Sequence, residues 1–263
     1  YGISGLFILK LSEKYNFTSK KMGFVYFLFI CLFNFKMVIT NIRCPLGTSI
    51  FIYTLYNDVF NKTKKRWLIL GYLICCGIHP IFILFILLRL VLLLNKLTEK
   101  TLYVMILFSS VFANKIFELF GKYTNIEVFS YLHMKMNYYL NFWNVSFNDK
   151  LIIVTAIIQI SVLVYYLIIA KKNIIKYSME EKFYKITLVF AILTISSYWN
   201  FVLFQRCSWL LIFFIIYWYI YIESLNFQKS KRKFRIYEIV MFVLVIFSLG
   251  SYFFTYQYNV LTF

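Results

Sequence analysis

Three ionisable side chains, Arg43, His79 and Arg206, lie inside or at the ends of long apolar runs. A charged group at membrane depth is costly unless it is paired or solvated, so each of the three is a candidate for function. Two arginines and a histidine without a carboxylate partner suit an anion, because guanidinium groups bind phosphate oxygens in a bidentate fashion. The near-neutral pKa expected of a histidine suits either anion binding or general-base chemistry.

Each of these residues also has a structural alternative. An arginine at a helix end can extend to lipid phosphates, and a lone histidine is often a satisfied core residue. Arg89 is predicted to reach the lipid headgroups near the cytoplasmic side in this way. Cys44 and Cys207 each directly follow an arginine, and a disulfide between them is an open alternative. The remaining cysteines are expected to be small packing residues: Cys31, Cys75 and Cys76.

Other chemistries find little support in the sequence. It contains no Gly-rich phosphate loop, no HExxH motif and no CxxC motif, and its two histidines are His79 and His133. Acidic residues of the polar stretch 114–149 lack the spacing of metal ligands: Glu118, Glu127 and Asp149. We therefore expect neither a metal nor another cofactor. A Ser-His-Asp arrangement stays open, although no nucleophile-elbow motif supports it.

The composition favours an all-α, polytopic membrane protein. Of the 263 residues, 62% are hydrophobic and only 14% are charged, which is more apolar surface than a soluble domain of this size can bury. The period-two alternation of a membrane β-barrel is absent. A net charge of +18 would suggest nucleic acid in a soluble protein. Here the basic residues fall in short connections between apolar runs, so no nucleic-acid partner is expected.

These basic connections predict the orientation of the chain. By the positive-inside rule the four connections 10–21, 61–66, 171–185 and 228–235 lie in the cytoplasm. Outward-facing hairpin tips then fall at 41–45, with Arg43, and at 205–207, with Arg206. We expect seven to eight transmembrane helices in a single integral membrane domain over 1–263. The clearest spans are 22–42, 46–60, 151–170, 184–204, 208–225 and 236–256.

The apolar run from Trp67 to Leu94 is too long for one straight span. Its 28 residues would form a helix of roughly 42 Å, beyond the roughly 30 Å of a bilayer core. Pro80 disfavours a helical His79, so a break is expected there. In one route, 67–94 is a hairpin of two half-helices with His79-Pro80 at its tip, and 97–113 crosses outward. In the other, 67–90 is one long tilted helix and 95–113 lies at the outer interface.

Both routes place the polar stretch 114–149 in an extracytoplasmic loop. Irregular backbone at membrane depth is tolerated only against protein or a water-filled cavity. The break therefore predicts a cavity lined by His79.

Residues 41–88, from "NIRCPLGTSIFIYTL" through "NKTKKRWLILGYLICCGIHPIFILFILL", resemble the EpsG-like branch of the Wzy-type polysaccharide polymerases. The shared pattern is an arginine opening a small-residue helix, a basic connection and an apolar helix ending in histidine. Arg43, "KTKKR" and His79 supply these parts, and Arg206 in "FVLFQRCSWLLIFF" resembles a later arginine. The resemblance covers about 41–225. The N-terminal section and "GxD" element usual in that family are not found, which is the pattern of a truncated or divergent member.

The resemblance implies a multi-pass enzyme of the bacterial inner membrane, an O-antigen or exopolysaccharide polymerase. Such a glycosyltransferase joins repeat units carried on undecaprenyl pyrophosphate at the outer face. Its partners would be the polyprenyl-pyrophosphate-linked oligosaccharide, the lipid bilayer, a chain-length regulator and a flippase. Arg43 and Arg206 would hold the pyrophosphate, and His79 would hold it too or act as the base.

Two other classes stay open from the residues. One is a different membrane glycosyltransferase or acyltransferase of the envelope that uses a lipid-linked substrate. The other is a non-enzymatic polysaccharide export subunit, which would need a continuous polar path across the membrane.

Overall fold

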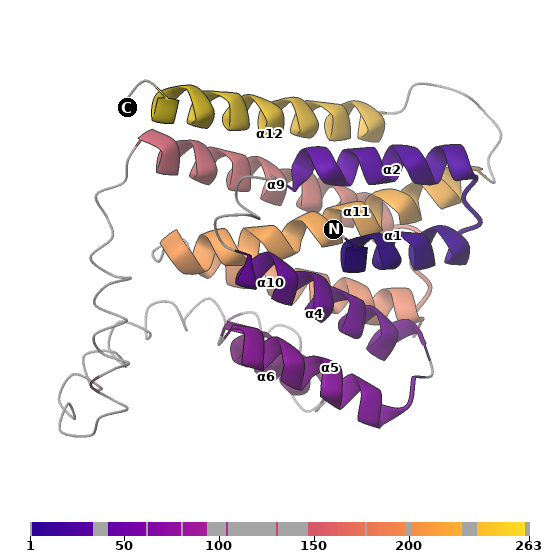
Figure 1. Cartoon of the computed structure of the whole chain (residues 1–263). Helices are drawn as coiled ribbons and strands as arrows, with labels where there is room; N and C mark the ends of the chain where they lie inside the picture. The colour runs from indigo at the N-terminus through magenta and orange to yellow at the C-terminus, as the bar shows by residue number, and fades with distance from the viewer. Residues whose placement is uncertain are drawn as a thin grey trace.

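The computed structural model describes most of the chain as a bundle of helices. Its described residues are 2–33, 42–61, 63–79, 81–93, 104, 130, 147–176, 178–197, 201–227 and 236–260. These ranges hold nine α-helices and no strand, so the all-α prediction is confirmed for them. The helices are α1 (Gly2–Lys14), α2 (Ser19–Leu32), α4 (Arg43–Phe60), α5 (Lys65–Ile78), α6 (Ile81–Leu93), α9 (Phe147–Lys171), α10 (Met179–Ser196), α11 (Phe201–Phe227) and α12 (Ile236–Val260). Figure 1 shows them side by side, with α12 at one edge and α5 with α6 at the other.

Helix α11 forms the centre of the bundle. From Leu210 to Ile222 no side chain is more than 6% exposed. This burial follows from the sequence, because a helix that is apolar on every face must be covered on every face. Helix α9 packs along α11, and α12 packs against α9 and α2.

Two segments of the described chain are long and apolar enough to cross a membrane. They are Ile153–Lys171 in α9 and Leu203–Leu225 in α11, with mean hydropathies of 2.4 and 1.6. Both coincide with predicted spans, 151–170 and 208–225. The seven to eight spans expected from the sequence, and the membrane location itself, remain predictions.

Helices α5 and α6 form the helical hairpin of the first route, so the long tilted helix of the second route is wrong. Helix α5 ends at Ile78, and His79 is extended, with φ −156° and ψ 130°. This conformation is the one favoured before a proline. Tyr72 of α5 and Arg89 of α6 both contact Asp58 of α4, which shows that the two helices run antiparallel. Each is only about 20 Å long, shorter than a bilayer core.

The predicted hairpin tip at 205–207 is wrong, because these residues lie inside α11. The preceding helix α10 ends earlier, at Ser196. There the hydroxyls of Ser196 and Ser197 donate to the carbonyls of Leu193 and Thr194, at 3.0 and 2.8 Å. Such local bonds compete with continued helix, whereas arginine is a good helix former. Arg206 therefore lies in the second turn of α11.

The N-terminal region also differs from the prediction. Residues 2–14 form α1, where the sequence suggested only a basic lead-in to the first span. The hydroxyls of Ser4 and Ser49 lie 2.8 Å apart, and the Lys10 ammonium donates to Asn57 Oδ1 at 3.0 Å, so α1 runs parallel to α4. Helix α2 ends at Leu32, and most of the remainder of the predicted 22–42 span lies outside the described residues. The segments 97–113 and 114–146 lie outside them as well, apart from residues 104 and 130.

Arg89 does not extend to the lipid headgroups as predicted. Its side chain is buried, and its Nε donates to Asp58 Oδ2 at 2.9 Å. The hydroxyl of Tyr72 donates to the same oxygen at 3.1 Å. The prediction that the apolar runs contain no carboxylate partner for a cation is therefore wrong for Arg89, because Asp58 is such a partner. One oxygen of Asp58 joins α4 to both α5 and α6.

Candidate functional site

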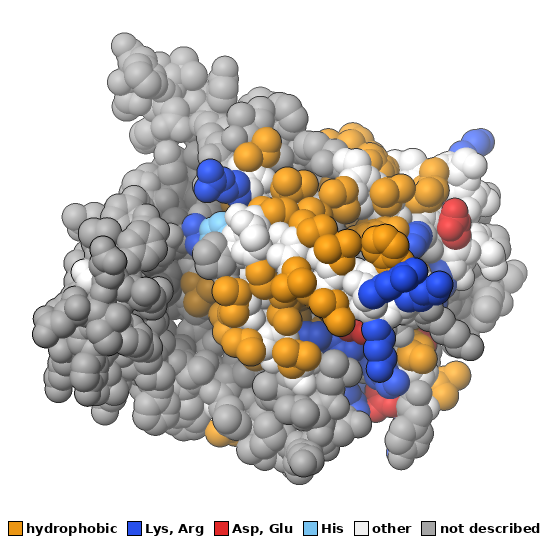
Figure 2. Space-filling model, turned by 60° about the horizontal axis from the view of Figure 1, so that its bottom comes forward, with side chains coloured by type: hydrophobic (Ala, Val, Ile, Leu, Met, Phe, Trp, Pro, Cys, Tyr) orange, Lys and Arg blue, Asp and Glu red, His pale blue; other side chains and the backbone are white. Residues whose placement is uncertain are grey.

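The three predicted site residues come together at one end of the bundle. Arg43 is the exposed first residue of α4, His79 is half-buried at the end of α5, and Arg206 is half-buried near the start of α11. The positive charges of Arg206 and Arg43 both act on His79. Figure 2 shows the described histidine beside basic side chains at one end of the apolar face. Three residues from distant parts of the sequence therefore share one electrostatic environment.

The thiols beside the two arginines support the same arrangement. Arg206 lies near Cys44, and Cys44 lies near Cys207, close enough for their charged forms to interact. The first turn of α4 therefore lies near the first turns of α11. Both cysteines are buried and free, so the alternative of a disulfide between them is not realised in the structure.

The backbone around His79 determines which imidazole nitrogen carries the proton. Nδ1 accepts a hydrogen bond from the Ile81 N–H at 3.2 Å, which satisfies one of the unpaired donors at the start of α6. Since Nδ1 is the acceptor, the proton of the neutral ring is on Nε2. The ring therefore offers its Nε2–H group as a donor, while the lone pair on Nδ1 already accepts the Ile81 N–H.

The protonation state of His79 differs from the sequence expectation. His79 lies in the break between α5 and α6, outside both helices. Burial, together with the charges of Arg206 and Arg43, lowers its pKa to about 4. The imidazole is thus neutral at neutral pH, whereas the sequence suggested a pKa near neutrality.

Gly47 allows the tip of the hairpin to approach α4 beside Arg43. A Cβ atom at Gly47 would lie 2.8 Å from Cζ of Phe82 and closer still to its Cε2. On the other side of the tip, the Cys75 thiol donates to the Gly47 carbonyl at a sulfur–oxygen distance of 3.7 Å. Phe82 is fully buried against Phe51 and Phe85, so its ring has little room to move. This contact lies about one turn after the start of α4 and three residues after His79, so it holds the tip of the hairpin near Arg43.

Gly47→Ala is expected to destabilise the protein by about 1–3 kcal/mol, because the added methyl group overpacks the Phe82 contact. The change is measured as a lower unfolding temperature in detergent. Gly77→Ala is the matched control, since no atom lies within 4 Å of a Cβ built there. Equal unfolding temperatures for the two variants would contradict the close approach at Gly47.

Sequence reasoning missed Asp58 and Tyr72 as partners of Arg89. A signal was available, because Asp58 is a carboxylate within the apolar run 46–60 and Arg89 a cation within the run 67–94. Opposite charges in neighbouring apolar segments are expected to pair. The number of residues between them gave no indication of which helix faces would meet.

Comparison with family models, curated proteins and solved structures finds no match to this chain.

Proposed function

We propose that this chain is a multi-pass protein of the bacterial inner membrane that polymerises lipid-linked oligosaccharide repeat units at the outer face. The observation that carries the proposal is the convergence of Arg43, His79 and Arg206 at one end of the bundle. The resemblance of residues 41–88 to the EpsG-like polymerases supplies the reaction class. The proposal requires neither a metal nor another cofactor.

The distribution of exposed side chains supports the membrane location. Large apolar side chains are exposed along α2, α5, α6 and α12, among them Phe27, Leu73, Leu87 and Phe242. Figure 2 shows apolar side chains covering one face between basic side chains near its two ends. An apolar surface bounded by basic ends matches a hydrocarbon core between two layers of headgroups.

The charge of the site fits the proposed leaving group. When the glycosidic bond to the lipid pyrophosphate breaks, negative charge grows on the phosphate oxygens. Arg43 and Arg206 would stabilise this charge as fixed cations, and the Nε2–H of His79 would donate to one of the oxygens. The acceptor hydroxyl forms the new bond to the sugar, and its proton passes to the departing pyrophosphate. Because the leaving pyrophosphate accepts this proton, the reaction does not require His79 as a base.

The test is polymerisation by the purified full-length chain in proteoliposomes. A polyprenyl-pyrophosphate-linked oligosaccharide is supplied as both donor and acceptor, and the products are separated by length. The proposal expects a ladder of products with release of polyprenyl pyrophosphate. A single addition without a ladder would point to a different glycosyltransferase, and unchanged substrate from a folded protein would overturn the proposal.

His79→Gln is expected to retain activity within about tenfold, whereas His79→Ala loses about 10²-fold. The glutamine amide still donates an N–H toward the phosphate but has no basic nitrogen. Because the pKa of His79 is about 4, its titration should cause no step in the rate between about pH 6 and pH 8. If the two variants lose activity equally, an N–H donor alone is not sufficient, and His79 acts as the general base.

A further inference from the structure

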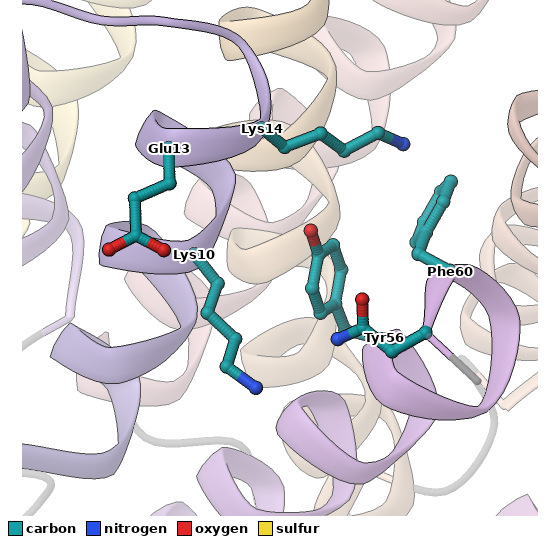
Figure 3. Close-up of a pocket in the computed structure, with 6 residues that line it drawn as sticks. Lys10, Glu13, Lys14, Tyr56 and Phe60 are labelled. Carbon is teal, nitrogen blue, oxygen red and sulfur yellow. The ribbon is translucent and has the colours of Figure 1, made fainter. Parts of the chain in front are cut away.

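A cavity lies at the opposite end of α4 from the arginines and His79. It has a volume of about 470 Å³. Helix α1 and the end of α4 provide its lining, which consists of Lys10, Glu13, Lys14, Tyr56, Phe60 and Asn61. Figure 3 shows Lys10 and Lys14 extending from α1 toward the α4 side chains, while Glu13 points elsewhere. No step of the proposed polymerase reaction uses this cavity.

Both ammonium groups keep hydrogen-bonding capacity for a ligand. Lys10 donates to Asn57 Oδ1 at 3.0 Å, and Lys14 donates to Glu180 Oε1 at 2.8 Å. An ammonium group has three N–H donors, so two remain on each lysine within the described part of the chain. The two ammonium groups lie apart, since Lys10 contacts Asn57 and Tyr53 whereas Lys14 contacts Phe60 and Glu180. Each offers its donors separately, and cationic N–H donors match the oxygens of a phosphate.

Aromatic rings hold the two ammonium groups in place. The Lys14 Nζ lies 3.5 Å from the centroid of the Phe60 ring, and the Lys10 Nζ lies 4.7 Å from that of Tyr53. Cation–π contacts of this kind restrict the ammonium positions. The rings of Phe60 and Tyr56 also give the cavity apolar walls. The carbon atoms of a lipid's glycerol can pack against such walls, whereas free phosphate has no carbon atoms to pack there.

The charge of the surroundings favours an anion from the membrane. Further basic residues lie at the ends of neighbouring helices: Lys20, Lys21, Lys64, Lys65, Arg66, Lys171 and Lys172. Basic pockets between helices at the cytoplasmic surface are typical sites for lipid headgroups.

We propose that this cavity binds the phosphate of a phospholipid headgroup from the adjacent leaflet. Lys10 donates to the phosphate oxygens, and Phe60 and Tyr56 cover the glycerol. Glu13 belongs to the same lining, and its negative charge weakens the site by repulsion even though its carboxylate points away from the α4 side chains (Figure 3). The inference uses the membrane location of the proposed function but is independent of the polymerase reaction.

The experiment measures binding of phosphatidylglycerol to the delipidated full-length protein by native mass spectrometry. Lys10→Gln is expected to weaken binding about fivefold, the factor for one lysine near an anionic lipid. Glu13→Gln is expected to strengthen it by a similar factor, because the substitution removes a negative charge. Lys65→Gln, an exposed lysine outside the cavity lining, is the matched control: it removes one charge from the surroundings, so its effect is expected to be much smaller than that of Lys10→Gln.

Opposite effects of two substitutions in one cavity separate this proposal from general loss of fold, which would weaken binding in both. Equal lipid binding by wild type, Lys10→Gln and Glu13→Gln would overturn it. Displacement of the lipid by millimolar inorganic phosphate, with the same dependence on Lys10, would identify a free-phosphate site and would also overturn it. The measurement needs no sugar substrate, so failure of the polymerase assay leaves its outcome unaffected.

Discussion

Replacing Arg206 with alanine is expected to reduce the rate of polymer formation by about 10²- to 10³-fold. This is the range for removal of one preorganised group that stabilises developing negative charge. Arg206 acts on His79 from the second turn of α11, so it lies where the proposed pyrophosphate leaves. Arg206→Lys is expected to recover part of the rate, because lysine keeps the charge but loses the bidentate fork.

Arg66→Ala is the matched control for this experiment. Arg66 is an exposed arginine near the start of α5, at the opposite end of that helix from His79. Its loss removes the same charge from the protein without touching the candidate site. Rates are compared in proteoliposomes at equal protein content, with unfolding temperatures measured in parallel. A normal ladder of products from folded Arg206→Ala and Arg43→Ala proteins would end the pyrophosphate assignment.

Asp58→Ala is expected to lower the free energy of unfolding by about 3–5 kcal/mol. The substitution leaves the buried guanidinium of Arg89 without its charge partner, and the Tyr72 hydroxyl loses its acceptor as well. The side chains of Arg89 and Asp58 are only 11% and 19% exposed, so water compensates little for the lost contact. The hairpin α5–α6 would loosen from α4, and with it the position of His79.

The double variant Asp58→Ala/Arg89→Met distinguishes a lost ion pair from a simple packing defect. Removing both charges leaves no uncompensated ion, so the double variant is expected to be more stable than Asp58→Ala alone. Chemical unfolding in detergent measures the three proteins side by side. If Asp58→Ala is as stable as wild type, the three-helix contact through Asp58 does not hold the hairpin.

The local features of the fold could be predicted from the sequence. The spans 151–170 and 236–256 correspond to α9 and α12, since continuous apolar runs bounded by polar residues define helix limits directly. The break at His79 follows from Pro80, whose steric effect on the preceding residue acts within a few bonds. The end of α10 is a local effect too. It depends on hydrogen bonds of Ser196 and Ser197, whereas the span was predicted from the positions of the charged residues alone.

The sequence by itself determined the residue types of the candidate site, the helical class of the fold and the break at His79. Only the tertiary structure decided that the break is a hairpin and which distant groups meet: Asp58 pairs with Arg89, the ring of Phe82 packs at Gly47, and the charges of Arg43 and Arg206 act on His79. The physical reason is that helix formation depends on neighbours in the chain, whereas these contacts depend on how each helix is rotated and packed. The fit of side chains across helix faces sets that rotation, and it leaves no periodic pattern in the sequence.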